Sequence, residues 1–153
     1  GIVQAHPDPT PKQEKNLIQL VWEQVQRSRQ VLGWNINGFD IPFLIQRSRI
    51  LGIPTPVFDL PLYRNSKLID LMQKWSCGGR HHKMDHVAMA MGIPGKTPLA
   101  GKLVWQVYAE GNHELGHQYI KQDGEVTWEI ARRMGYLPTE KPLPSAEDDP
   151  IPF

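Results

Sequence analysis

The sequence has 153 residues and contains little cysteine, little net charge and no long apolar run. Its single cysteine, Cys77, excludes an internal disulfide framework and a four-cysteine zinc site, and favours a reducing, cytoplasmic environment. Seventeen Lys and Arg residues face sixteen Asp and Glu residues, so bulk charge argues neither for nor against a nucleic-acid partner. Because apolar runs are short and residues 1–10 lack a basic start and an apolar core, we expect no membrane-spanning helix and no signal peptide.

The composition is that of a globular protein, with 40% apolar and 22% charged residues. A chain of this length fits one domain with a sizeable core. We expect residues 1–11 to be an irregular lead-in, because prolines crowd its second half, and residues 12–138 to form the domain. Residues 139–153 are rich in proline and acidic side chains, which predicts a disordered or loosely docked tail.

The first half of the domain carries a pattern of helix, strand, polar turn and helix. Apolar residues at helical spacing predict an amphipathic helix over residues 12–29, with Thr10 as its N-cap. Residues 30–34 predict a short buried strand. After the polar turn, Asp40 is expected to cap a helix that ends at Gly52. This order favours an α/β fold, in which ligands meet the ends of strands at such corners.

The second half of the domain is mostly helical in pattern. Residues 67–75 begin apolar and predict a short strand that passes into a helix. At the start of this helix, Asp70 is a candidate cap or ion-pair partner, and a role near the functional site is the alternative. Short helices are expected around residues 84–91 and 103–109. The longest helical pattern covers residues 114–134.

The string HELGH offers one candidate site. His113 and His117 are four residues apart on one helical face, where they could hold zinc with Glu114 as the general base of a metallopeptidase. Zinc there needs a third protein ligand. The extended motif would place a turn at Ile120 and its third ligand at Asp123, which instead continues the helical pattern. The alternative interpretation is two histidines that are solvated or partly buried.

Tyr119 and Asp123 offer a second candidate site on the same helix. They are also four residues apart, so they share a face. A helical carboxylate can hold a divalent metal through oxygen, and a tyrosine hydroxyl one turn earlier can orient a water that attacks phosphorus. The pair by itself is a weak signal, but it gains weight from Asp40 at the strand-to-helix corner.

The segment GWNINGFDIPFLIQRS resembles the second motif of the proofreading 3′–5′ exonuclease domain of family-B DNA polymerases and of stand-alone polymerase-B-like exonucleases. In that motif an Asn lies five residues before an Asp, and the same Asp belongs to a Phe-Asp-x-Pro segment. The corresponding residues here are Asn35, Phe39, Asp40 and Pro42.

The segment YIKQDGEVTWEIARRM resembles the third motif of the same family, with Tyr119, Asp123 and Thr127 at the matching positions. LIDLM and MDHVAMAMGIPGK are similar to the segments that connect the two motifs. The resemblance covers roughly residues 31–135 in order, which makes it more specific than HELGH.

The resemblance implies the tyrosine variant of the DEDD superfamily, with a ribonuclease-H-like exonuclease fold and two divalent cations, Mg²⁺ or Mn²⁺. Asp40 and Asp123 would then be metal ligands and Tyr119 would orient the nucleophilic water. Asn35 and Phe39 would contact the terminal nucleotides. The substrates would be single-stranded DNA or frayed 3′ ends, or RNA.

The chain departs from the family pattern in one respect. The family carries Asp-x-Glu on its first strand, upstream of the second motif, and no acidic residue before Asp40 forms that pattern here. We therefore expect the N-terminal strands of the fold to be absent, and activity to be weak. The absence of these strands favours self-association, or a second chain that supplies them. The alternative is a non-catalytic fragment that binds nucleic acid or a partner.

Arg47, if it lines the groove beside the site, would bind backbone phosphates.

Overall fold

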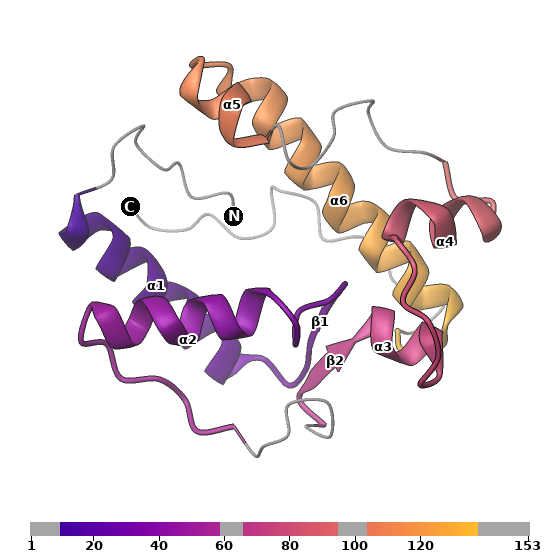
Figure 1. The fold of residues 1–153 in the computed structure, drawn as a ribbon, viewed down its shortest axis with the longest axis horizontal. Coiled ribbons are helices and arrows are strands. Elements are labelled where there is room, and N and C mark those ends of the chain that lie inside the picture. Colours follow the sequence, from indigo (N-terminus) through magenta and orange to yellow (C-terminus); the bar gives the residue numbers. More distant parts are fainter. Residues whose placement is uncertain (1–9, 59–65, 95–103, 138–153) are drawn as a thin grey trace. The chain divides into compact units, whose positions relative to one another are not determined.

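The computed structural model describes residues 10–58, 66–94 and 104–137, and in these ranges the chain forms six helices and two strands (Figure 1). The described residues belong to two compact units, one within Asp8–Val87 and the other within Ala88–Phe153. We call them the N-terminal and C-terminal units. The expected lead-in up to residue 9 and the expected tail lie outside the described residues.

The first helix, α1 (Pro11–Arg27), begins at the expected cap. The Thr10 side chain accepts a hydrogen bond from the backbone N–H of Gln13, and the Gln13 side chain accepts one from the backbone N–H of Thr10. This capping box satisfies two N–H groups that a helix start leaves without helical partners. Pro11 occupies the first helical position, where its missing N–H costs nothing.

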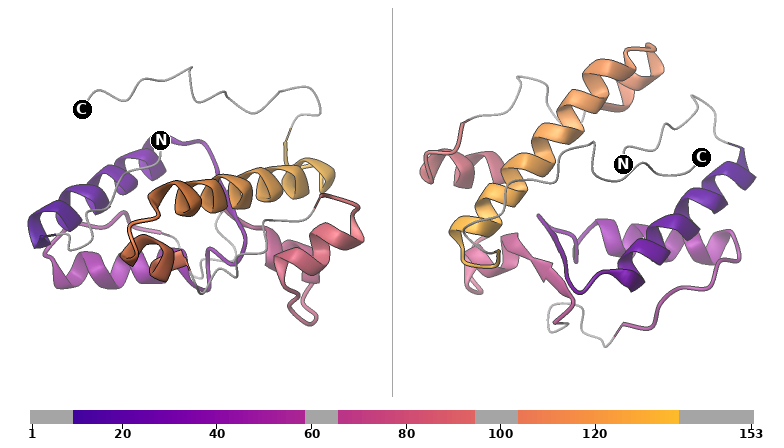
Figure 2. Two further views of the ribbon diagram at one scale, coloured as in Figure 1. Left: turned by 90° about the horizontal axis from the view of Figure 1, so that it is seen from above. Right: turned by 180° about the vertical axis from the view of Figure 1, so that it is seen from behind.

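A strand–helix–strand unit follows, made of β1 (Val31–Gly33), α2 (Asp40–Ile50) and β2 (Leu68–Asp70). The two strands are parallel, with Val31 opposite Leu68 and Gly33 opposite Asp70. Parallel strands need a crossover connection, and α2 lies on it. The mixed order of strands and helices is compatible with the α/β interpretation. Both views of Figure 2 show α1 and α2 side by side.

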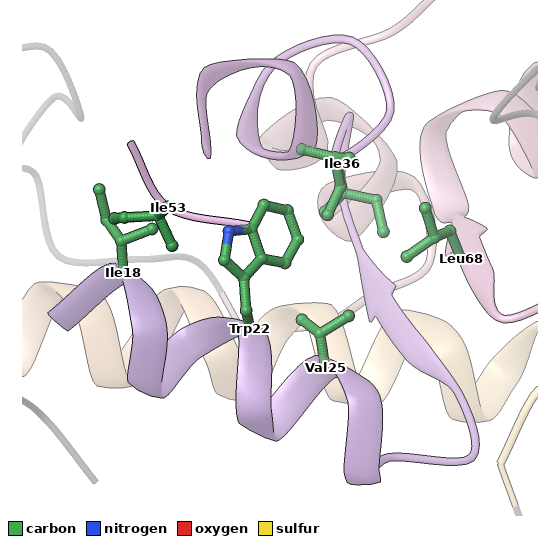
Figure 3. Packing of buried hydrophobic residues seen from close by; sticks show 7 residues of the cluster. Ile18, Trp22, Val25, Ile36, Ile53 and Leu68 are labelled. Atoms are coloured by element: carbon green, nitrogen blue, oxygen red, sulfur yellow. The ribbon is translucent and has the colours of Figure 1, made fainter. Parts of the chain in front are cut away.

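The core of the N-terminal unit lies between α1, α2 and the two strands (Figure 3). One face of α1 supplies Ile18, Trp22 and Val25, which the helical period brings to the same side. The Trp22 indole N–H donates to the Ser48 hydroxyl at 2.8 Å, so both buried polar groups of this contact are satisfied. The remaining buried members of the cluster are Ile36, Ile41, Ile53 and Leu68.

Three further helices are short. The first, α3 (Leu71–Ser76), follows β2 directly, with Asp70 as its N-cap, which is one of the two roles that the sequence left open. The second, α4 (Met84–Ala90), contains the boundary between the two units. The third, α5 (Val104–Ala109), packs against the long helix α6 (His113–Arg133) in the C-terminal unit. None of the helices in the described ranges combines the length and apolar character required to cross a bilayer.

The role expected for Asp40 as a helix cap is wrong. Phe39 is the N-cap of α2, no side chain caps the helix, and Asp40 is its first helical residue. The reason lies in the preceding turn, where the carbonyl groups of Asn35 and Ile36 accept the N–H groups of Phe39 and Ile41. Because the turn itself satisfies these donors, the Asp40 carboxyl is not needed to cap the helix.

We predict that Ser48→Ala lowers the free energy of unfolding by about 1–3 kcal/mol, since it leaves the buried indole N–H of Trp22 without an acceptor. Urea unfolding followed by tryptophan fluorescence measures the change. The control is Ser28→Ala, which removes a hydroxyl hydrogen bond to Gln24 at the exposed end of α1 and should change stability by less than about 0.5 kcal/mol. Equal losses in the two variants would contradict the prediction.

Candidate functional site

The turn between β1 and α2 carries the residues of the second sequence motif. Asn35 adopts a left-handed backbone conformation with φ of 62°, which asparagine tolerates better than most residues. Its carbonyl oxygen accepts hydrogen bonds from the N–H groups of Gly38 and Phe39 at 3.1 and 3.0 Å. The chain therefore reverses sharply within a few residues and enters α2 at Asp40.

The carboxylate of Asp70 holds this turn from the end of the neighbouring strand. Its oxygens accept the backbone N–H of Asn35 at 3.0 Å and that of Asn37 at 3.1 Å. The same carboxylate accepts the N–H of Met72 at 3.0 Å and that of Gln73 at 3.4 Å, and so caps α3. Only 1% of Asp70 is exposed, so these hydrogen bonds replace the water that a buried carboxylate gives up.

Two glycines allow the turn to pack this closely. A side-chain carbon at Gly38 would collide with the amide oxygen of Asn35, and one at Gly33 would collide with the side chain of Ile36. The glycines are required here by close approach, because the neighbouring side chains occupy the space that a Cβ would need. The spacing of Gly33, Asn35 and Gly38 is therefore a packing requirement of the motif.

Asp40 lies at the first position of α2, on the surface of the N-terminal unit. Although the residue is exposed, partial desolvation of its carboxyl group raises the pKa above the ordinary aspartate value. A hydrogen bond from its own backbone N–H lowers the pKa in part, and the negative charge of Asp70 raises it further. A carboxylate that is costly to ionise by itself gains from a cation, so this position suits a metal ligand.

Phe39 forms an exposed aromatic pair with Phe43 on the first turn of α2. The two rings are stacked, with centroids 6.2 Å apart and planes 11° from parallel. Phe39 is 64% exposed and Phe43 is 50% exposed, which is unusual for side chains of this size. Sequence reasoning singled out only Phe39. The helical spacing of four residues is the signal that would have found its partner.

Arg47 lies on α2 and binds α1. Its guanidinium donates two hydrogen bonds of 2.7 Å to the two carboxylate oxygens of Glu14. This pair lowers the pKa of Glu14, chiefly through the hydrogen bonds from Arg47. The two residues lie far apart in the sequence, so no local pattern could have predicted the pairing. A contact of Arg47 with phosphate stays a prediction, and it would compete with Glu14.

Tyr119 and Asp123 lie on α6 in the C-terminal unit, and both side chains are half-buried. They share a helical face, as their spacing predicts. The Thr127 hydroxyl donates to the Asp123 carbonyl at 2.7 Å, one turn further along. Asp40 belongs to the other unit, so the convergence of Asp40 and Asp123 on one metal site stays a prediction.

The HELGH string forms a packing contact. The ring of Tyr108 from α5 lies 5.6 Å from the His113 ring and 5.9 Å from the His117 ring, measured between centroids. A side-chain carbon at Gly116 would lie only 2.6 Å from the Tyr108 ring. Both histidines and the glycine between them therefore provide the surface on which α5 packs.

Carboxylate oxygens are the ligands that Mg²⁺ and Mn²⁺ prefer. Asp40 offers such a ligand at the surface of the N-terminal unit, and Asp123 offers a second on α6. Over residues 10–58, 66–94 and 104–137, no three His, Cys, Asp or Glu side chains form a group that could hold a metal. Within the described residues, neither unit by itself forms a complete metal site.

We predict that the pKa of Asp40 exceeds that of an ordinary aspartate and falls in Asp70→Asn. The substitution removes a negative charge that disfavours the ionised form of Asp40. Carbon-detected NMR titration of the side-chain carboxyl measures both values. A pKa in the variant equal to or higher than that of the wild type would contradict the prediction. Because protons compete with the metal, cation binding at Asp40 should strengthen as the pH rises through this pKa.

We also predict opposite effects for two glycine substitutions on α6. Gly116→Ala should destabilise the protein by about 1–3 kcal/mol, because the new methyl group collides with the Tyr108 ring. Gly124→Ala should stabilise it by up to about 1 kcal/mol, because nothing lies near the added methyl group and alanine favours the helix. Thermal unfolding followed by circular dichroism tests the pair. Similar effects of the two substitutions would show that α5 does not pack as described.

One protein family matches the chain. The family is described as predicted 3′–5′ exonucleases related to the exonuclease domain of PolB, and its model matches residues 3–140. The match includes both motif segments and confirms the resemblance seen in the sequence. No curated protein and no solved structure is significantly similar to the chain. The chain therefore belongs to the family of predicted 3′–5′ exonucleases related to the exonuclease domain of PolB.

Proposed function

We propose that the protein is a metal-dependent 3′–5′ exonuclease domain of the tyrosine DEDD type, with a ribonuclease-H-like fold. It would hydrolyse phosphodiester bonds at the 3′ ends of single-stranded DNA or RNA. The observation that carries the proposal is the family match over residues 3–140. The parallel strand pair, with Asp40 on the helix that follows β1, supports it, because ligands of α/β folds bind beyond the carboxyl ends of parallel strands.

In this proposal Asp40 and Asp123 hold Mg²⁺ or Mn²⁺. A pair of such cations stabilises the charge on the attacking and leaving oxygens of a phosphodiester and helps to form hydroxide from water. Tyr119, one helical turn before Asp123, orients the water through its hydroxyl group. The roles follow the family motifs, and the oxygen chemistry of the two carboxylates fits these hard cations.

Asn35 and Phe39 contact the terminal nucleotides in this proposal. Phe39 and Phe43 present two exposed, stacked rings beside Asp40, and unpaired bases stack readily on aromatic rings of this kind. The amide of Asn35 lies on the same turn and can accept or donate a hydrogen bond to a sugar or base. Arg47 would contact a backbone phosphate only if it leaves Glu14.

The Asp-x-Glu pair of the family does not occur upstream of Asp40, so this proposal requires two more carboxylates for full activity. Within the described residues, β1 pairs with β2 alone, which leaves its other edge available to a further strand. Val31 and Leu32 on β1 are only half-buried, which supports the same idea. A further strand from a second chain would complete the site. The alternative is a non-catalytic domain that binds nucleic acid or a partner.

We predict that digestion of labelled single-stranded DNA by this chain is slow, requires Mg²⁺ or Mn²⁺, and stops when EDTA is added. Asp40→Asn and Asp123→Asn should each reduce the rate by at least about a hundredfold. Loss of a residue that only orients a metal ligand costs up to about a hundredfold, and loss of the ligand itself should cost at least as much. The control is Glu23→Gln, which neutralises an exposed acidic residue on α1 and should leave the rate unchanged.

Two outcomes would contradict this proposal. Full activity of both aspartate variants would show that neither carboxylate holds the metal. Binding of the DNA without any metal-dependent digestion, measured by fluorescence anisotropy and unaffected by either aspartate substitution, would instead support the non-catalytic alternative.

A further inference from the structure

We propose that Asp70 is the positioning residue of this site: its buried carboxylate fixes the turn that carries Asn35 and leads into Asp40. The proposal rests on the proposed function, since it assigns Asp70 a role in the site where Asp40 holds the metal. Asp70 acts through the backbone of the turn and does not itself touch the metal or the substrate.

The contacts of Asp70 divide between two elements. One oxygen accepts the N–H groups of Asn35 and Met72, each at 3.0 Å, and the other accepts the N–H of Asn37 at 3.1 Å. With both oxygens engaged by backbone donors and only 1% of the residue exposed, the carboxylate has little capacity left to serve as a ligand. Its hydrogen bonds to charged oxygen are of the stronger kind, about twice the strength of neutral ones.

The strand register explains why this carboxylate can reach the turn. Asp70 lies opposite Gly33, the last residue of β1, in the parallel pair. The backbone that leaves β1 therefore passes directly beside the Asp70 side chain. A charged acceptor at this point accepts two N–H groups of the turn, those of Asn35 and Asn37, which lie beyond the end of β1.

The conformation of the turn determines where Asp40 lies. Asn35 is held in its left-handed conformation, its carbonyl group accepts the N–H of Phe39, the N-cap of α2, and the carbonyl group of Ile36 accepts the N–H of Ile41 in the first turn of the helix. A carboxylate that ligates a metal must be held within a fraction of an ångström to be effective. The N-cap of α2 is Phe39, and no side-chain hydrogen bond caps the helix, so the turn must fix where the helix starts.

The competing interpretation is that Asp70 serves only as the N-cap of α3. Two variants separate the roles. Asp70→Ser keeps a good capping side chain for Met72 and Gln73, but its hydroxyl is too short to reach Asn35 and Asn37. Asp70→Asn keeps the size and shape, but it presents an amide N–H₂ where the backbone offers only donors. Ser48→Ala is the control, because it destabilises the same unit without touching the turn.

The experiment uses the ¹⁵N-labelled full chain with Mn²⁺ alone as the probe. Amide hydrogen exchange reports the hydrogen bonds of Asn35, Asn37 and Met72, and paramagnetic broadening of the amides around Asp40 reports Mn²⁺ binding. Asp70→Ser should speed exchange at both Asn35 and Asn37 by about tenfold, as expected for a lost hydrogen bond. Asp70→Asn should do so at Asn37, because its amide oxygen can still accept the N–H of Asn35 while its N–H₂ faces that of Asn37. Both variants should weaken Mn²⁺ binding by about tenfold to a hundredfold, the usual cost of losing a residue that orients a ligand.

Met72 should stay protected in Asp70→Ser, and Ser48→Ala should leave both the turn and Mn²⁺ binding unchanged. If Mn²⁺ broadens the amides around Asp40 in the wild type and binds Asp70→Ser equally well, the positioning role is overturned while the metal site stands. If Ser48→Ala weakens Mn²⁺ binding as much as the Asp70 variants do, the effect is one of general stability and the role is again overturned. If Mn²⁺ does not broaden these amides in the wild type, the proposed function fails, and the assignment of Asp70 fails with it.

Discussion

The buried carboxylate of Asp70 is the constraint on which the N-terminal unit depends. It satisfies backbone donors of the turn after β1 and of the first turn of α3, and thus joins two corners of the fold at one point. Taking a carboxylate out of water is costly unless several hydrogen bonds replace the lost solvent. Because backbone N–H groups supply them here, any rearrangement of the turn would leave a buried charge with too few partners. One side chain thereby gives the strand-to-helix corner a single conformation.

The two candidate sites that the sequence offers differ in the surroundings of their side chains. The HELGH string has the letters of a zinc motif, but its two histidines flank the ring of Tyr108, and its glycine permits the close approach of α5. The second motif has an exposed carboxylate and exposed aromatic rings on a tightly fixed turn. A small residue between two histidines is explained by packing, whereas exposed phenylalanines beside an acid are not. Burial and contact decide which of two motifs is available for chemistry.

Much of the local structure could be predicted from particular residues. Thr10 and Pro11 mark the start of α1, the spacing of Ile18, Trp22 and Val25 marks its buried face, and the apolar residues before Asp70 mark β2. The expectation that Asp40 caps α2 was wrong, because the carbonyl groups of Asn35 and Ile36 satisfy the donors at the helix start. These carbonyl groups can replace the Asp40 carboxyl as acceptors only once the turn has formed. The pairing of Glu14 with Arg47 likewise joins positions that no local pattern connects.

The sequence by itself determined the order of helices and strands and the family of the chain, and it predicted which acids could hold a metal. These follow from hydrophobic period, capping chemistry and motif spacing, all of which act over short stretches of chain. The tertiary structure alone decided that Asp70 holds the turn of Asn35, that Arg47 binds Glu14, and that Tyr108 packs against two histidines. Each of these contacts joins separate elements, so it exists only where the strands pair in register or the helices pack.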